Sequence, residues 1–179
     1  EGRKPALTPF VKKTGLRGAV ISAVDLIQGI GRCAEMEVVK VEGATGTFET
    51  NFAGKAAAAI DVLARGADYV YVHIEAADEC GHHGQLKEKI YSIEQIDEKV
   101  LRPIYDFLES TGEDYAILVL PDHPTPLKIR THSAESVPFV LYRKGDAAGK
   151  TLRYTEEDAK TTGIYVDAGY RLIDRMRRV

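Results

Sequence analysis

Histidine and aspartate side chains gather in three short polar segments of the chain. Four of the five histidines and two aspartates occur there, namely Asp78, His82 and His83, then Asp122 and His123, and finally His132. Neutral imidazole and carboxylate oxygen together suit a divalent ion such as Mn²⁺, Zn²⁺ or Co²⁺, and the sequence has no thiolate-rich motif. These residue types therefore predict a divalent metal site.

The spacing within the segments indicates which side chains share an ion. Asp78 and His82 are four residues apart with Gly81 between them, so a tight loop turn could aim both at one ion. Asp122 and His123 are adjacent and could bind one ion or two. His132 provides a candidate ligand from the third segment.

Two other histidines are left out of the predicted site. We expect the His83 side chain to point away from its neighbour His82. His73 lies within a predicted strand, where a hydrogen-bonded core or surface histidine is the usual state.

Each of these residues taken alone has an ordinary structural explanation. A histidine after a strand usually lies at the surface, an aspartate before a helix is usually a cap, and Asp-His-Pro is a common turn. Together they favour a site, because three histidine-bearing segments at one sheet edge are hard to obtain by chance.

Alternating strand-like and helix-like segments must position these residues. Short apolar, β-branched runs predict strands over 18–24, 37–41, 68–74, 114–120 and 138–142. Helical patterns cover 25–36, 53–65, 85–110 and 166–176. The alternation predicts a three-layer α/β/α sandwich with a mainly parallel sheet.

This fold class explains how the polar segments meet. Ligands bind outside the carboxyl ends of the strands in open α/β sheets. The first polar segment follows strand 68–74 and the second follows strand 114–120, so we expect both at one rim of the sheet.

Composition and length limit the classes of protein to consider. With 24 basic and 27 acidic side chains the net charge is −3, which argues against a nucleic-acid partner. No apolar run approaches the ~18 residues of a membrane helix, no secretory signal opens the chain, and two cysteines suggest a reducing compartment. We expect one domain over 1–179, a cytoplasmic location and an extended lead-in over the first dozen residues.

Two further motifs, a dinucleotide-binding fingerprint and a cysteine near a histidine, give less specific signals than the metal-ligand segments. Gly29, Gly31 and Ala34 fit the dinucleotide fingerprint G-x-G-x-x-A, but a helix start at Asp25 intervenes where the preceding strand should run into the first glycine. Cys80 lies near His82, which leaves a reactive thiol as a minor alternative.

A family resemblance becomes specific at the ligand segments. The chain resembles the carboxyl-terminal half of the cofactor-independent phosphoglycerate mutases, in particular their archaeal-type branch, within the alkaline-phosphatase-like metalloenzyme superfamily. The residues that carry the similarity are the stretch from His73 to His82, Asp122-His123-Pro-Thr-Pro126, and Thr131-His132 before Val137-Pro138-Phe139. Similarity extends back through 18–27 and 42–46. Departures from the family pattern, at Ala77, His83 and 133–135, fall outside the ligand positions.

The resemblance implies a metal-dependent isomerase. Asp78, His82 and His132 would hold one divalent ion, and Asp122 with His123 would supply part of a second. Mn²⁺ is expected first, then Zn²⁺, Co²⁺ or Mg²⁺, with no need for 2,3-bisphosphoglycerate. The activity implied is the glycolytic and gluconeogenic interconversion of 2- and 3-phosphoglycerate through a phosphoserine.

The resemblance also implies that parts are missing. The family's serine nucleophile and first metal-binding aspartate match nothing in this chain, so no catalytic residue is assigned. We expect an incomplete sandwich that lacks its amino-terminal part and has little activity alone. Its unpaired strand edge would favour a homodimer or strand exchange.

Two basic residues between the ligand segments are candidates for substrate binding. Lys128 and Arg130 lie between two ligand segments and are candidates, by charge, for binding the small phosphorylated substrate. Alternatives are a phosphatase or phosphotransferase with another substrate, such as a homoserine-kinase-like activity, and a non-catalytic metal-binding core.

Overall fold

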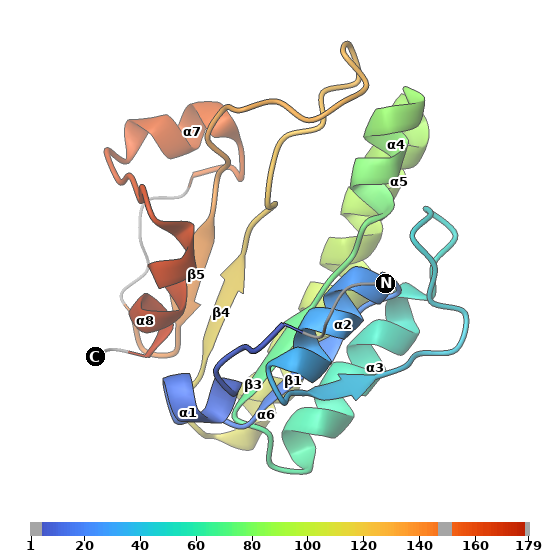
Figure 1. The fold of residues 1–179 in the computed structure, drawn as a ribbon. Coiled ribbons are helices and arrows are strands. Elements are labelled where there is room, and N and C mark those ends of the chain that lie inside the picture. The colour runs from blue at the N-terminus through green and yellow to red at the C-terminus, as the bar shows by residue number, and fades with distance from the viewer. Residues whose placement is uncertain (1–4, 147–151, 178–179) are drawn as a thin grey trace.

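The computed structural model describes residues 5–146 and 152–177 (Figure 1). Three parallel strands form one sheet in the order β2-β1-β3, with β1 at Gly18–Ile21, β2 at Glu37–Val39 and β3 at Tyr69–Val72. The central strand β1 is almost wholly buried, because sheet neighbours flank it on both sides. The predicted parallel sheet is therefore present.

The other two strands pair with each other. Strands β4 (Ala116–Val119) and β5 (Val140–Arg143) are antiparallel, with Ile117 opposite Tyr142. A parallel neighbour needs a helical crossover, whereas the connection from β4 to β5 contains only turns and extended chain. All five predicted strands are thus found, and each is shorter than its apolar run. They form two sheets, however, so β3 and β4 do not share the single sheet edge that we expected.

Helices cover both faces of the parallel sheet. Helix α2 (Asp25–Cys33) approaches one face closely, because a Cβ at Gly31 would lie only 3.1 Å from Cγ2 of Val20. Neighbouring strand residues point to opposite faces, and Val72 packs on the other face against α3 (Phe52–Ala64). This arrangement confirms the three-layer sandwich.

The core lies between α3 and the segment that follows β3. Asn51 begins α3, where its side-chain oxygen accepts a hydrogen bond from the Gly54 amide at 2.8 Å. The buried cluster consists of Phe52, Ala56, Ala76 and Val100.

The polar segment after β3 is a helix and not the loop that we expected. Helix α4 (Ala76–His83) ends at Gly84, whose left-handed φ of 70° turns the chain into α5 (Leu86–Ile96). The two helices lie side by side as a hairpin (Figure 1). Asp78 and His82 therefore share one helix face, four residues apart.

The predicted long helix over 85–110 is present but interrupted. A π-helical turn, η1 (Asp97–Leu101), separates α5 from α6 (Arg102–Thr111). The buried residues of α5 are Ser92 and Gln95, whereas the apolar residues of its first turns are about half exposed, namely Leu86, Ile90 and Ile93.

The chain ends differ in part from expectation. Helix α1 (Phe10–Thr14) replaces the end of the expected extended lead-in, whose residues 1–4 lie outside the described part. The predicted helix over 166–176 is limited to a 3₁₀ turn, η2 (Gly169–Arg171), and α8 (Leu172–Met176). Helix α7 (Glu156–Thr161) was not predicted, although Thr155 caps it through the Asp158 amide.

Two further points follow from the helices. Gly29 and Gly31 lie inside α2, so the dinucleotide fingerprint has no phosphate-binding loop. Among the residues that the structure describes, none of the helices combines the length and apolar character that crossing a membrane requires.

Candidate metal centre

The three polar segments meet beside the outer end of the α4–α5 hairpin. Asp78 and His82 come from α4, His123 comes from the turn after β4, and His132 comes from the long connection to β5. In Figure 1 this connection extends to the outer end of α4. Residues distant in sequence thus form one cluster.

The inner part of the cluster contains one carboxylate and two imidazoles. The Nε2 atom of His82 lies 3.4 Å from Oδ2 of Asp78, and Nε2 of His132 lies 3.5 Å from Oδ1 of Asp78. The two Nε2 atoms are 3.1 Å apart. Each of the three residues offers a ligand atom within 4.8 Å of the others.

A backbone contact orients the His82 ring. Its Nδ1 atom lies 3.1 Å from the carbonyl oxygen of Arg130. A carbonyl only accepts hydrogen bonds, so Nδ1 carries the proton and Nε2 keeps its lone pair. Arg130 itself has a left-handed φ of 53°, which few non-glycine residues adopt. The free nitrogen therefore faces Asp78 and His132.

The donor set fits a divalent ion. Two imidazole nitrogens and a carboxylate are typical ligands of catalytic metals, which keep a position open for water or substrate. The side chains of Asp78, His82 and His132 are 26%, 32% and 51% exposed, so a small ligand can reach them.

His123 and Asp122 extend the cluster on one side. The His123 ring stacks on the His132 ring with centroids 3.6 Å apart, and its Nδ1 is 3.9 Å from Oδ1 of Asp78. Asp122 is 72% exposed and reaches the cluster through His123, whose Nε2 is 3.5 Å from its Oδ2. These two residues offer two further donors.

Thr125 is a member of the site that the sequence analysis did not identify. It is buried, donates a hydrogen bond to Oδ1 of Asp78, and lies 3.3 Å from Nδ1 of His123 through the same hydroxyl. The available signal was a hydroxyl residue between Pro124 and Pro126, directly after the Asp-His pair.

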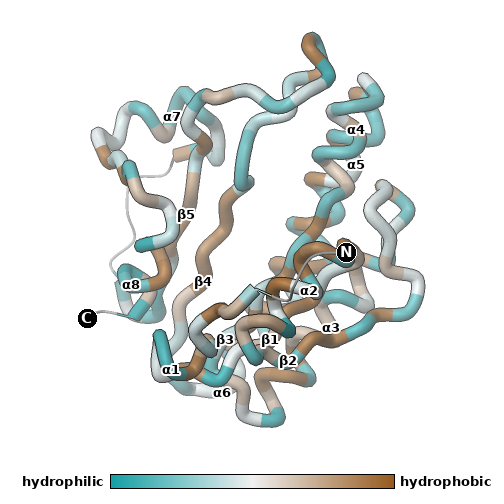
Figure 2. Tube along the Cα trace, in the orientation of Figure 1, coloured by the Kyte–Doolittle hydropathy of each residue, from teal (hydrophilic) through white to brown (hydrophobic). Residues whose placement is uncertain are grey.

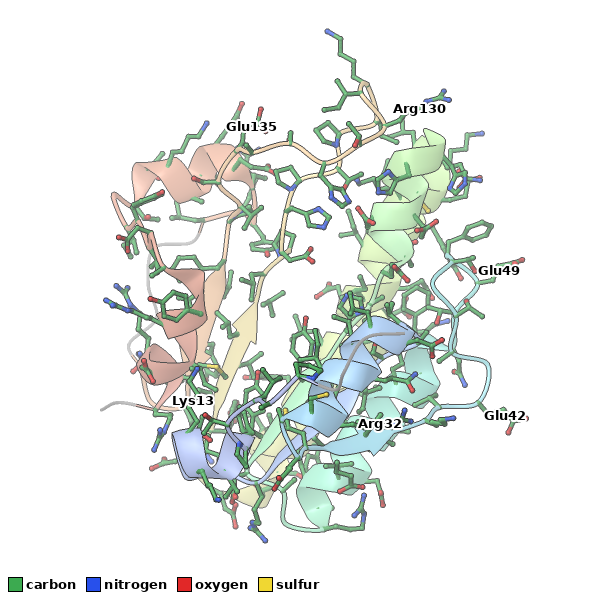
Figure 3. All side chains as sticks on the ribbon, in the orientation of Figure 1. Lys13, Arg32, Glu42, Glu49, Arg130 and Glu135 are labelled. Carbon is green, nitrogen blue, oxygen red and sulfur yellow. The ribbon has the colours of Figure 1, made fainter. Side chains whose placement is uncertain are left out.

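The two candidate substrate-binding residues lie in the exposed turn that follows. Lys128 and Arg130 are both exposed. Arg130, labelled in Figure 3, lies beside the outer end of α4, where its guanidinium carbon would be 2.9 Å from a Cβ at Gly84.

The remaining histidines lie as expected. The Nδ1 atom of His83 is 2.9 Å from the Glu79 carbonyl oxygen, and the side chain is 65% exposed, away from the cluster. His73 follows β3, where its Nδ1 lies 3.2 Å from Oγ of Ser22. Burial lowers the pKa of His73, opposed by the nearby carboxylate of Asp122.

A buried lysine supports the end of β3. The Lys55 side chain is almost fully buried, and its Nζ donates to the His73 carbonyl at 3.2 Å. Burial lowers the Lys55 pKa to about 8, and the nearby Glu75 carboxylate opposes the shift. The pKa of Glu75 is raised, first by burial and then by Glu79.

Cys80 does not fit a reactive thiol. Its side chain is buried in α4 and its Sγ lies 4.0 Å from Oγ of Ser92. Burial raises the pKa of the Cys80 thiol, which disfavours the nucleophilic thiolate.

Comparison with known families agrees with this geometry. The sequence profile of the Metalloenzyme superfamily matches residues 2–167, which is most of the chain. The protein is also similar to a probable 2,3-bisphosphoglycerate-independent phosphoglycerate mutase of Geobacter sulfurreducens, with 49% identity over 98% of the chain. A 2,3-bisphosphoglycerate-independent phosphoglycerate mutase of Methanothrix thermoacetophila is 46% identical over 97% of the chain. The match spans 44% of the length of each of these relatives.

Solved structures share the fold. The PH0037 protein of Pyrococcus horikoshii superposes with a TM-score of 0.81 and 28% identity, over 98% of this chain and 52% of that one. The cofactor-independent phosphoglycerate mutase of Thermoplasma acidophilum gives 0.64 and 22%, over 97% of this chain and 39% of that one. The predicted alkaline-phosphatase-like fold is thus confirmed.

Proposed function

The chain belongs to the Metalloenzyme superfamily, and on that premise we propose that it is part of a 2,3-bisphosphoglycerate-independent phosphoglycerate mutase. The observation that carries the proposal is the cluster of Asp78, His82 and His132 at the outer end of the α4–α5 hairpin. The identity of 49% to the Geobacter mutase supports the choice of substrate. The proposed reaction interconverts 2- and 3-phosphoglycerate in glycolysis and gluconeogenesis.

The proposed metal roles follow the geometry of the donors. Asp78, His82 and His132 hold one ion, and Asp122 with His123 supplies part of a second, with Mn²⁺ as the expected metal. Bound divalent ions would lower the pKa of a nucleophilic hydroxyl and neutralise charge on the transferring phosphoryl group. The chain's own contribution is to orient the imidazoles and to keep the site open to substrate.

The remaining catalytic groups are expected elsewhere in the whole enzyme. Asp122 and His123 give the second ion only two protein donors, where about four ligands are usual. We place the missing ligands and the serine that carries the phosphoryl group outside these 179 residues. Residues 1–179 then form one part of the metal-binding domain and have little activity alone.

Two cations are proposed to bind the substrate. Lys128 and Arg130 are exposed in the turn between His123 and His132, close enough in sequence to the ligands to meet a bound phosphoglycerate. Arginine suits a bidentate contact with carboxylate or phosphate, and lysine provides a point charge.

Calorimetric titration of the chain with Mn²⁺ tests the metal site. We expect binding that is lost in His82→Ala and in His132→Ala, because each removes one of three clustered donors. His83→Ala is the matched control, since His83 is adjacent to His82 but points away, and it should bind as the wild type does. Unchanged binding in both ligand variants would refute the site.

An assay of the whole enzyme separates the candidate substrates. With Mn²⁺ present, we expect conversion of 3-phosphoglycerate to 2-phosphoglycerate and no turnover of homoserine with ATP or of a simple phosphomonoester. Turnover of either alternative substrate in place of phosphoglycerate would assign a kinase or phosphatase. We further propose a cytoplasmic location. We also propose that the isolated chain self-associates through strand edges that have no partner among the described residues.

A further inference from the structure

The side chain of Thr125 occupies a buried position at an otherwise open site. Between Leu120 and Val137, all of which the structure describes, Thr125 is the only buried residue, with 5% exposure. Its hydroxyl faces two predicted ligands at once, Asp78 and His123. A hydroxyl in this position can control the orientation of both.

Counting protons on the hydroxyl fixes the direction of each hydrogen bond. An ionised aspartate only accepts, so Thr125 donates its single proton to Oδ1 of Asp78. The contact of 3.3 Å to Nδ1 of His123 must then run the other way, with the ring nitrogen donating to Oγ1 of Thr125. His123 is therefore the tautomer protonated at Nδ1.

This tautomer leaves the opposite ring nitrogen available. Nε2 of His123 keeps its lone pair and lies 3.5 Å from Oδ2 of Asp122. The partner of one imidazole nitrogen commonly decides which nitrogen can bind a metal. The Thr125 hydroxyl thus sets the tautomer of His123, just as the Arg130 carbonyl sets the tautomer of His82.

Contacts from both helices of the hairpin hold Thr125 in place. Nζ of Lys89, on α5, donates to the Thr125 carbonyl oxygen at 2.8 Å. On α4, a Cβ at Gly81 would lie 2.6 Å from the same oxygen, so only glycine allows this approach. The position of the hydroxyl is fixed by α4 and α5 together.

We propose that Thr125, held by Lys89, is a positioning residue that fixes the Asp78 carboxylate and holds His123 in the tautomer whose Nε2 is free for an ion. The role of Thr125 in metal binding rests on the proposed metal site. The hydrogen-bond chain itself exists in the protein without a metal. That chain runs from Nδ1 of His123 through Oγ1 of Thr125 to Oδ1 of Asp78.

Two variants separate the hydroxyl from the shape of the side chain. Thr125→Val keeps the shape and removes the hydroxyl, and Thr125→Ser keeps the hydroxyl. The readout is the ¹⁵N chemical shifts of the His123 ring in the metal-free chain at about pH 8, above the ordinary imidazole pKa. We expect the Nδ1-protonated form in the wild type and in Thr125→Ser, and loss of that preference in Thr125→Val.

Mn²⁺ affinity supplies the second measurement. Removing a group that orients a ligand commonly weakens metal binding about 10–100-fold, so we expect that loss in Thr125→Val and near wild-type affinity in Thr125→Ser. An unchanged His123 tautomer in a folded Thr125→Val would overturn the proposal, as would equal affinity losses in both variants.

A further variant tests the proposal independently if Thr125→Val does not fold. Lys89→Met removes the ammonium that holds the Thr125 carbonyl and leaves the hydroxyl in place. We expect a weakened Nδ1 preference of His123, and an unchanged one would count against the proposal. If the wild type shows the tautomer but binds no Mn²⁺, the positioning role stands and the proposed metal site fails.

Discussion

A metal-binding imidazole almost always donates its second ring N–H to a partner, which fixes the tautomer and orientation of the ring. His82 has the Arg130 carbonyl and His123 has the Thr125 hydroxyl. In both rings the partner leaves Nε2 unprotonated. Nε2 of His82 faces Asp78 and His132, and Nε2 of His123 faces Asp122. At the scale of single residues, protein contacts alone therefore set the ring orientations that the proposed metal site requires.

Lys55 gives the stability of the chain a recognisable pH dependence. Its pKa is about 8 in the folded chain and 10.5 when exposed, so between these pH values the unfolded state binds more protons. The free energy of unfolding should therefore rise with pH across this window, by on the order of 1–3 kcal/mol. Urea titrations at several pH values measure the rise.

The control for this prediction is an exposed lysine. Lys55→Met should abolish the rise, whereas Lys12→Met, on the exposed side of α1, should retain it. A flat profile for the wild type would show that water reaches the Lys55 ammonium in the folded chain.

The two cysteines should react at different rates. Burial and a raised pKa protect Cys80, whereas Cys33 is partly exposed. We expect a thiol reagent such as 5,5′-dithiobis(2-nitrobenzoate) to label Cys33 first in the folded chain, and both cysteines together in denaturant. Mass spectrometry of labelled peptides identifies the order, and early labelling of Cys80 would restore the reactive-thiol hypothesis.

The residues of the site were more predictable than their partners. Asp78, His82, His123 and His132 are identifiable because their own side chains carry the chemistry. The Arg130 carbonyl is a backbone group 48 positions from His82, so no residue type marks it. Thr125 acts through one hydroxyl, which in a sequence is typical of any polar turn.

At the scale of elements, the site depends on close contact between the backbone of α4 at Gly81 and the turn after β4 at Thr125. Glycine inside a helix costs about 1 kcal/mol relative to alanine, yet Gly81 lies within α4. The cost is offset because the Thr125 carbonyl oxygen occupies the space that a Cβ would need.

Two glycine-to-alanine variants test this approach. Gly81→Ala should lower the free energy of unfolding by about 1–3 kcal/mol, because backbone must move to accept the methyl group, and should weaken Mn²⁺ binding. Gly29→Ala is the matched control inside α2, where nothing lies within 4 Å of a Cβ, and should stabilise by about 0.5–1 kcal/mol. Thermal unfolding and calorimetry provide both readouts, and a destabilisation shared equally by the two variants would contradict the account.

The elements that the sequence predicted well are those with local signals. The strands are marked by β-branched apolar runs and α3 by the helical pattern over 53–65. The segment 75–84 resembled a loop because its chemistry is polar, and polar residues on a two-turn helix produce no apolar period. Packing against α5 decides its state, and that contact cannot be seen in the segment itself.

At the scale of the whole molecule, the two sheets leave free edges. Within the described residues, β3 pairs only with β1 and β4 only with β5. Figure 2 shows β4 as apolar, yet all four of its residues are only half-buried. A cavity of about 450 Å³ lies between this sheet and the η1–α6 segment, lined by Leu101, Tyr105, Ile117, Val119 and Val140, among others.

This apolar surface should make the isolated chain associate. We expect sedimentation velocity to show a larger species as concentration rises, and Val140→Lys to shift it toward monomer. Leu26→Lys is the control, because Leu26 is a more exposed apolar residue on α2 that does not line the cavity beside β4 and β5. A wild-type chain that stays monomeric at every concentration would contradict the expectation.

The π-helical turn at Asp97–Leu101 sets how the helix α5 is rotated about its axis relative to the helix α6. One additional residue per turn rotates the following helix by about 100° relative to an uninterrupted one. The polar Ser92 and Gln95 can thus face inward on α5 while Val100 enters the apolar core. Shortening the chain by a single residue here would change the phase between the ligand-bearing hairpin and the sheet. The number of residues in this turn therefore fixes how the hairpin is oriented relative to the sheet.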